Sequence, residues 1–358
     1  MLRLLVRRSN DVTYFTNDAA RELDTLRDGG PGWWLRGCGD PRDPRDVERV
    51  LTSTDRSGVQ GYDVVVAAPR PISILVAIDP DQASGVVAAH RASVAATMRY
   101  LEERALVVRD RRGGEDRDRA ATWQRIVSFT HGLNRHGEPH LHDHVLVGAR
   151  PDGARTVLDS RALFAHASAA DALYRSSLRH ELAERTTWTA WRSFHGVDHV
   201  VGQDEGYRAL WGGHHEARGE KLSWRRSETL EHWRDDLARF APEGALVEPS
   251  RPRSHLDEHV FAAALEGRPD AARRHVVQAW ANAATYGQDP RELNSSIDRL
   301  FPTLAASRGV RESTIGLTQA RMIAAVRERG PRPLDVAELS TWAQRSRERS
   351  GAWPDRSR

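Results

Sequence analysis

The feature that most constrains this chain is a run of five histidines within fourteen residues, from His131 to His144. Residues 125–131 and 141–149 have the apolar composition of two strands, and the polar stretch between them predicts a hairpin. Residues two apart on a strand point to the same face, so His140, His142 and His144 share one face. The hairpin brings His131 alongside them.

Imidazoles that converge from two paired strands can form a metal site with open coordination positions. The alternative is a solvated, histidine-rich hairpin that binds nothing. Five histidines that bracket the apolar stretch Val145-Leu146-Val147 favour the metal site.

The length of 358 residues, 39% of them hydrophobic, allows one large domain and a smaller second one. We expect a main domain over residues 1–240 and a proline-containing linker over 241–254. Helical apolar spacing predicts a small helical domain over 255–345, and the charged tail 346–358 is expected to be disordered.

Composition narrows the setting of the protein. Lys221 is the only lysine beside many arginines, which suits phosphate binding but would also follow from a GC-rich genome. Cys38 is the only cysteine, so no intrachain disulfide can form and a reducing compartment is expected. No apolar run reaches membrane-spanning length, so we expect a cytoplasmic protein. The sequence also lacks G-x-x-x-x-G-K-[ST], the phosphate loop of an attached helicase.

The histidine segment carries a specific resemblance. Phe129-Thr130-His131 is followed by Pro139, Leu141-His142 and His144, and this spacing resembles the three-histidine motif of MobF-class conjugative relaxases, the TrwC/TraI type. The resemblance implies that His131, His142 and His144 bind a divalent metal, either Mg²⁺ or Mn²⁺, with Zn²⁺ or another transition metal as an alternative. His140 remains a competing ligand or a supporting group.

The resemblance covers roughly residues 1–235. Residues 61–73 resemble the strand and turn of the family that contain Asp63 and Arg70, residues 161–175 resemble its helix after the metal strands, and residues 32–37 resemble its tryptophan segment. It implies an α+β fold, an antiparallel sheet flanked by helices, followed by the C-terminal helical domain. Asp63 is then expected to hydrogen-bond a ligand imidazole, and Arg70 to contact DNA.

Tyr14 lies just after the first predicted strand, where the resembling family has its nucleophile. The implied activity is site- and strand-specific nicking of single-stranded DNA at a transfer origin through a 5′-phosphotyrosine. The implied partners are origin DNA, single-stranded and hairpin or duplex, with a separate helicase and transfer machinery. Many family members carry a paired tyrosine here, whereas this chain has Phe15. Two alternatives stay open: an origin-binding protein that does not nick, and a metal-dependent hydrolase unrelated to DNA.

Overall fold

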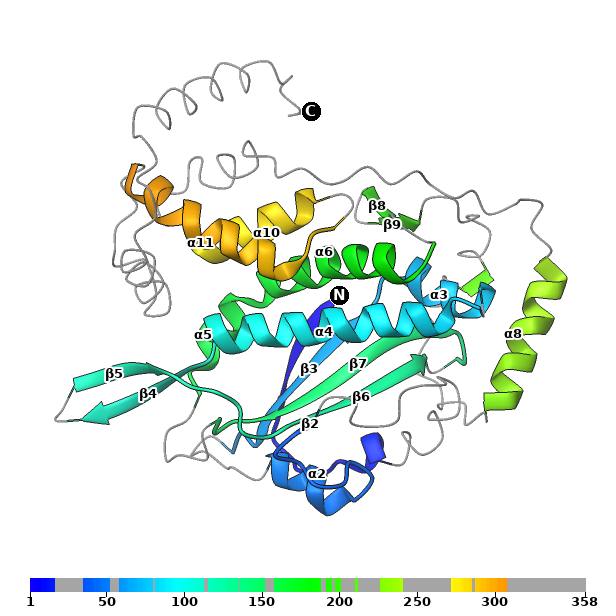
Figure 1. The fold of residues 1–358 in the computed structure, drawn as a ribbon. Helices are drawn as coiled ribbons and strands as arrows, with labels where there is room; N and C mark the ends of the chain where they lie inside the picture. The colour runs from blue at the N-terminus through cyan, green and yellow to red at the C-terminus, as the bar shows by residue number, and fades with distance from the viewer. Residues whose placement is uncertain are drawn as a thin grey trace, which may run out of the picture.

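A five-stranded antiparallel sheet forms the centre of the fold (Figure 1). In spatial order its strands are β1 (Leu2–Arg7), β3 (Gly61–Ala67), β7 (Pro139–Gly148), β6 (Ile126–Leu133) and the two-residue β2 (Leu35–Arg36). The α+β class and the antiparallel sheet expected from the sequence are therefore confirmed.

The computed structural model describes residues 1–16, 35–51, 58–79, 81–112, 115–134, 136–151, 158–187, 191–194, 197–200, 210–211, 226–240, 272–284 and 287–307. Its helices are α2 (Pro44–Leu51), α3 (Arg70–Ile78), α4 (Ala83–Arg104), α5 (Ser160–Ala165), α6 (Ala167–Arg185), α8 (Arg226–Phe240), α10 (Arg273–Ala283) and α11 (Pro290–Ser307). Two small hairpins complete the set: β4 (Val107–Arg112) with β5 (Glu115–Ala120), and β8 (Trp191–Phe194) with β9 (Val197–Val200). None of the described helices is long and apolar enough to cross a membrane.

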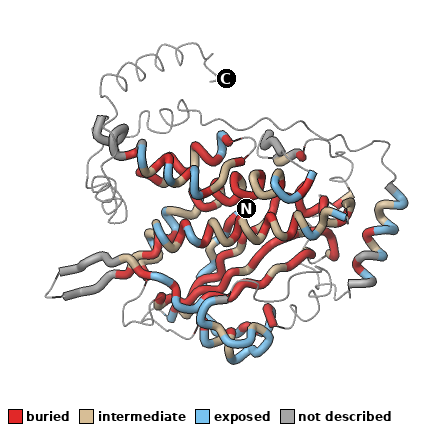
Figure 2. The backbone as a smooth tube through the Cα atoms, viewed as in Figure 1, coloured by how far each residue is buried: buried red, intermediate tan, exposed pale blue. Residues whose placement is uncertain are grey.

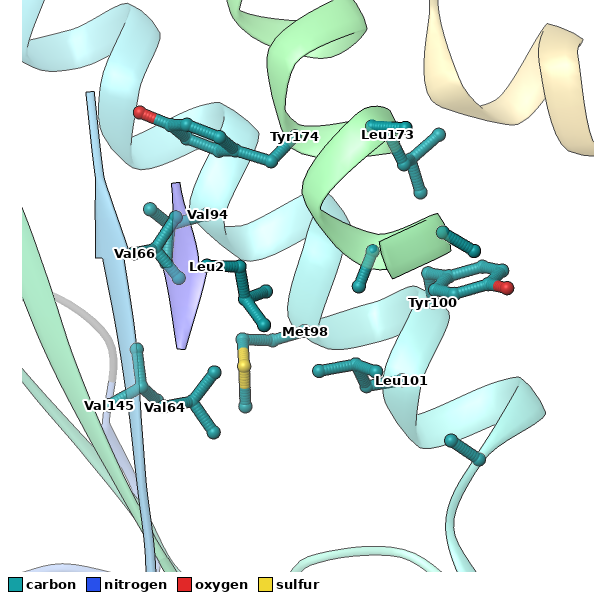
Figure 3. Packing of buried hydrophobic residues seen from close by; sticks show 14 of the residues in the cluster. Leu2, Val64, Val66, Val94, Met98, Tyr100, Leu101, Val145, Leu173 and Tyr174 are labelled. Carbon is teal, nitrogen blue, oxygen red and sulfur yellow. The ribbon is translucent and has the colours of Figure 1, made fainter. Parts of the chain in front are cut away.

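Helices cover the two faces of the sheet unequally. α4 and α6 lie over one face, and the short α2 lies under the other, so the sheet and the inner sides of α4 and α6 are buried (Figures 1 and 2). Alternation along the strands directs Val64 and Val145 toward the α4 face, where they approach Met98 (Figure 3). The histidines of β6 and β7 lie on the other face of the sheet, the one that α2 lies under.

The helical region after the histidine strands, part of which resembles one helix of the family, consists of two helices. α5 ends at Ala165, and α6 begins at Ala167. His166 stands at the break, and its Nδ1 lies 2.9 Å from the Tyr100 hydroxyl of α4. Asp159, rather than Ser160, caps the first helix, because its carboxylate accepts a hydrogen bond from the Arg161 amide.

The β4–β5 hairpin, which contains the charged residues 109–112 and 115–119, projects from the body of the protein (Figure 1). The register places Arg109 opposite Asp118 and Asp110 opposite Arg117. Pairing opposite charges across the strands stabilises such a hairpin, a cross-strand effect that a reading along the sequence does not reveal.

α10 and α11 pack outside α6 and share its core. Val276 and Trp280 of α10, with Ile297 and Phe301 of α11, belong to the same buried cluster as the sheet valines. Asp298 also pairs with Arg104 of α4 and with Arg273. The predicted domain boundaries stay predictions, and the predicted linker and tail lie outside the described residues.

Because α10 shares the main core, we expect Trp280→Ala to destabilise the whole protein by about 3–5 kcal/mol. Urea unfolding followed by circular dichroism should show one transition at lower urea. Asn282→Ala, on the exposed side of α10, should change the free energy of unfolding by less than about 0.5 kcal/mol. If Trp280→Ala instead removed a separate transition at low urea and left the main transition unchanged, the result would support an independent helical domain.

Candidate active site

Strand pairing gathers the three predicted ligands. β7 lies between β6 and β3, and the register sets His142 opposite His131 and His144 opposite Phe129. The ring centroids are 5.2 Å apart for His131 and His142, and 5.3 Å for each of the other two pairs. The expected cluster of His131, His142 and His144 is therefore present on one face of the sheet.

Hydrogen bonds select the tautomers of two of these histidines. His144 Nδ1 lies 2.9 Å from an Asp63 carboxylate oxygen, and His142 Nδ1 lies 2.8 Å from the His140 carbonyl. A carboxylate and a carbonyl only accept, so both Nδ1 atoms carry the proton and both Nε2 atoms keep a lone pair. This is how metal-binding histidines are usually supported.

Burial favours the neutral form of His142 and of His140. It holds the pKa of His142 well below its ordinary value, and the neighbouring histidines lower it further. Burial, followed by the charge of Arg70, lowers the pKa of His140 to about 4. Neutral imidazoles are the form that binds metals.

The residues fit a metal ion in spacing and tautomer. Three imidazoles around a tetrahedral ion, with nitrogens about 2.1 Å from it, have centroids roughly 5 Å apart, which matches the observed separations. As they stand, however, no group of three or more His, Cys, Asp or Glu side chains in the described part of the chain is arranged to hold a metal. Imidazole donors favour Mn²⁺, Zn²⁺ or another transition metal over Mg²⁺.

Tyr14 faces this cluster. Its ring centroid lies 5.9 Å from that of His131, nearly parallel, and 5.8 Å from that of His144. The side chain is 44% exposed, so the phenol borders both the histidines and solvent.

Phe15 explains how Tyr14 is held there. Phe15 is 1% exposed and packs on Phe129 and against the His144 ring. Arg7 lies over the outer side of the Phe15 ring at 5.4 Å and donates to the Asp11 carbonyl. Phe15 is thus buried in the core and fixes the backbone next to Tyr14. A tyrosine at position 15 would have its hydroxyl buried.

A buried network that was not predicted from the sequence lies behind the site. Asp143 alternates with the histidines and points to the opposite face, where its carboxylate accepts a hydrogen bond from Ser128 at 2.7 Å and lies 3.1 Å from His90 Nε2. The other nitrogen of His90 meets the Tyr174 hydroxyl at 2.7 Å. Strand alternation could have indicated this network. Asp143 lies between His142 and His144 on one strand, so its carboxylate must point to the opposite face, into the core, where it needs hydrogen-bond partners.

Arg70 lies at the edge of the site, half-buried at the start of α3, and its partners are protein atoms: the Glu138 carboxylate and the Pro139 carbonyl. The predicted roles of Tyr14, Asp63, Arg70 and the three histidines stay predictions. The tryptophan pair Trp33 and Trp34 lies outside the described residues.

A comparison with protein families matches residues 33–285 to the TrwC relaxase family. That segment is more than two thirds of the 358 residues. The chain belongs to the TrwC relaxase family. No curated protein matches the chain.

Solved structures of TrwC share the fold. One, complexed with a 27-mer DNA comprising the recognition hairpin and the cleavage site, has 17% sequence identity and a TM-score of 0.52. A metal-bound complex with oriT DNA has 18% identity and a TM-score of 0.53, and a metal-free one has 18% and 0.51. Each match covers 67% of this chain and 99% of the TrwC chain. At this identity the likeness establishes the relaxase fold.

We expect Asp63→Asn to weaken metal binding about 10- to 100-fold, because Asn lacks the negative charge that keeps the proton on His144 Nδ1 and raises the basicity of His144 Nε2. Isothermal titration with Mn²⁺ measures this. Asp46→Asn on α2 removes a carboxylate that contacts no histidine of the cluster, and should bind as the unaltered protein does. Equal affinity in Asp63→Asn would contradict the role of Asp63.

The lowered pKa of His140 predicts acid lability of the metal-free protein. Unfolded histidine takes up a proton near pH 6.5, whereas native His140 does so only near pH 4. The contribution of neutral His140 to the free energy of unfolding is therefore complete above about pH 6.5 and declines as the pH falls toward 4. Between pH 7 and pH 5 we expect a loss on the order of 1–2 kcal/mol in urea unfolding, and a shallower decline in His140→Gln.

Proposed function

We propose that this chain is a relaxase that nicks single-stranded DNA at a transfer origin, with Tyr14 as nucleophile. The observation that carries the proposal is the Tyr14 ring, 5.9 Å and 5.8 Å from the rings of His131 and His144 and open to solvent. A DNA phosphate would approach the phenol from its solvent-exposed side. The family match and the DNA-bound TrwC structures support DNA as the substrate.

The reaction is a transesterification. The Tyr14 oxygen loses its proton and bonds to the phosphorus, and the bond from phosphorus to the 3′ oxygen breaks. The 3′ oxygen takes up a proton, which leaves a free 3′-hydroxyl and a 5′-phosphotyrosine. The new phosphodiester keeps the bond energy, so the reverse attack by a 3′-hydroxyl can reseal the strand.

The three histidines would hold a divalent cation, which would polarise the non-bridging phosphate oxygens and offset charge in the transition state. Asp63 holds the His144 imidazole in the tautomer that this requires. Phe15 and Arg7 hold the turn that presents Tyr14, so the phenol is positioned before DNA binds.

The second candidate function is an origin-binding protein that does not nick. Phe15 in place of a paired tyrosine favours it, since the residue next to Tyr14 in the chain has no phenol for a second transfer. A single tyrosine is enough for cutting and resealing, so we retain the nickase as the conclusion.

Tyr14→Phe should abolish nicking of a supercoiled plasmid that carries the cognate origin, assayed with Mn²⁺, and should abolish the covalent adduct with a 5′-labelled strand. The matched control is the double variant Tyr14→Phe/Phe15→Tyr, which keeps the composition but puts the phenol in the buried position. It should also be inactive.

Nicking that survives in Tyr14→Phe would remove Tyr14 as the nucleophile. Absence of nicking by the unaltered protein, with origin binding intact, would favour the binding protein. Metal-dependent hydrolysis without any protein–DNA adduct would favour a hydrolase of another kind.

A further inference from the structure

The side chain of Arg70 forms hydrogen bonds with residues at the turn between β6 and β7. Nη1 donates to the Pro139 carbonyl at 2.7 Å, and Nη2 donates to the Glu138 carboxylate at 3.0 Å. Both bonds use the flat fork of the guanidinium, which lysine lacks. The fork therefore joins α3 to the last residues of the turn at two points.

Glu138 is itself built into the turn. It is buried, and its carboxylate also accepts a hydrogen bond from Asn134 Nδ2 at 2.5 Å. Asn134 Oδ1 in turn accepts from the amides of His136 and Glu138. The turn, residues 134–138, thus has an internal network whose charged member is neutralised by Arg70.

Three further hydrogen bonds fix the neighbouring backbone. The Leu141 amide donates to Ser73 Oγ at 3.0 Å, and the Leu141 carbonyl accepts from the Ala68 amide at 2.9 Å. From the other side, Trp233 Nε1 of α8 donates to the Gly137 carbonyl at 2.9 Å. Residues on both sides of His140 are therefore tied to elements outside the hairpin.

The geometry points to Arg70 as a positioning residue for the metal histidines, an inference that rests on the proposed function. His131 and His142 are opposite one another near this turn, with a register shift between His131 and Leu133. Any movement of the turn changes their separation. Arg70, through Glu138 and Pro139, holds the turn in the form that keeps the two rings 5.2 Å apart.

The competing prediction is that Arg70 binds a DNA phosphate. Its side chain is only 27% exposed, and a phosphate placed there would meet the Glu138 carboxylate as well. The two roles make opposite predictions for Glu138. Neutralising the Glu138 carboxylate should lower the Mn²⁺ affinity if Arg70 positions the turn. It should raise the DNA affinity if Arg70 contacts DNA.

The test is a double-mutant cycle with Arg70→Gln, Glu138→Gln and the double variant, measured by Mn²⁺ titration calorimetry. Each single variant should lose on the order of tenfold in Mn²⁺ affinity, and the double variant should lose no more than Arg70→Gln alone, because that change already removes the Arg70–Glu138 ion pair. Arg70→Lys keeps the charge without the fork and should resemble Arg70→Gln. Arg3→Gln, an exposed arginine of β1, is the charge control and should bind Mn²⁺ normally.

DNA binding is measured separately, in EDTA, with a fluorescent single-stranded oligonucleotide at several salt concentrations. The salt slope should be unchanged in Arg70→Gln. The inference is overturned if that slope falls by about one, if Arg70→Lys behaves as the unaltered protein, or if Glu138→Gln only raises DNA affinity. Unaltered protein that binds no Mn²⁺ overturns the proposed function as well, whereas Mn²⁺ binding that the variants leave unchanged overturns this inference alone.

Discussion

The site depends on the antiparallel pairing of β7 with β6 and β3. That pairing aligns His142 with His131 on one side and with Ala67 on the other. A slip of β7 by one residue would turn His142 and His144 into the core and Asp143 to the face that now carries the histidine cluster. The register is protected because Val145 and Val147 are fully buried against the helices, so the same slip would expose them. Hydrophobic burial on one face thus fixes chemistry on the other.

Two buried aspartates pair with histidines on opposite faces of this sheet. Asp63 hydrogen-bonds His144 on the face that carries the histidine cluster, and Asp143 hydrogen-bonds His90 inside the core. Both pairs satisfy a carboxylate that would be costly to bury alone. They differ in what else the imidazole can reach: His90 is enclosed and bonded at both nitrogens, whereas His144 keeps Nε2 toward the cluster. The same kind of pair is enclosed in the core in one place and, in the proposed function, supports a metal ligand in the other.

Position relative to the core also separates Tyr14 from Phe15. These neighbours differ by one oxygen atom, yet one borders the histidines and solvent while the other lies between Phe129 and Arg7. The turn is stable because the apolar residue is the buried one. A single phenol is consistent with this packing, since the adjacent position has no access to substrate.

The sequence by itself determined the face that the alternating histidines share, because strand periodicity is a local property. It also indicated the family and its α+β fold, through motifs that resemble those of the family. Asp63 and Tyr14 were indicated through the same resemblance. Only the tertiary structure decided that Asp63 reaches His144, that Arg70 bonds the hairpin turn, that Asp143 meets His90, and that α10 shares the main core. These contacts join segments dozens of residues apart, and their distances depend on how the sheet and helices pack, which no local pattern encodes.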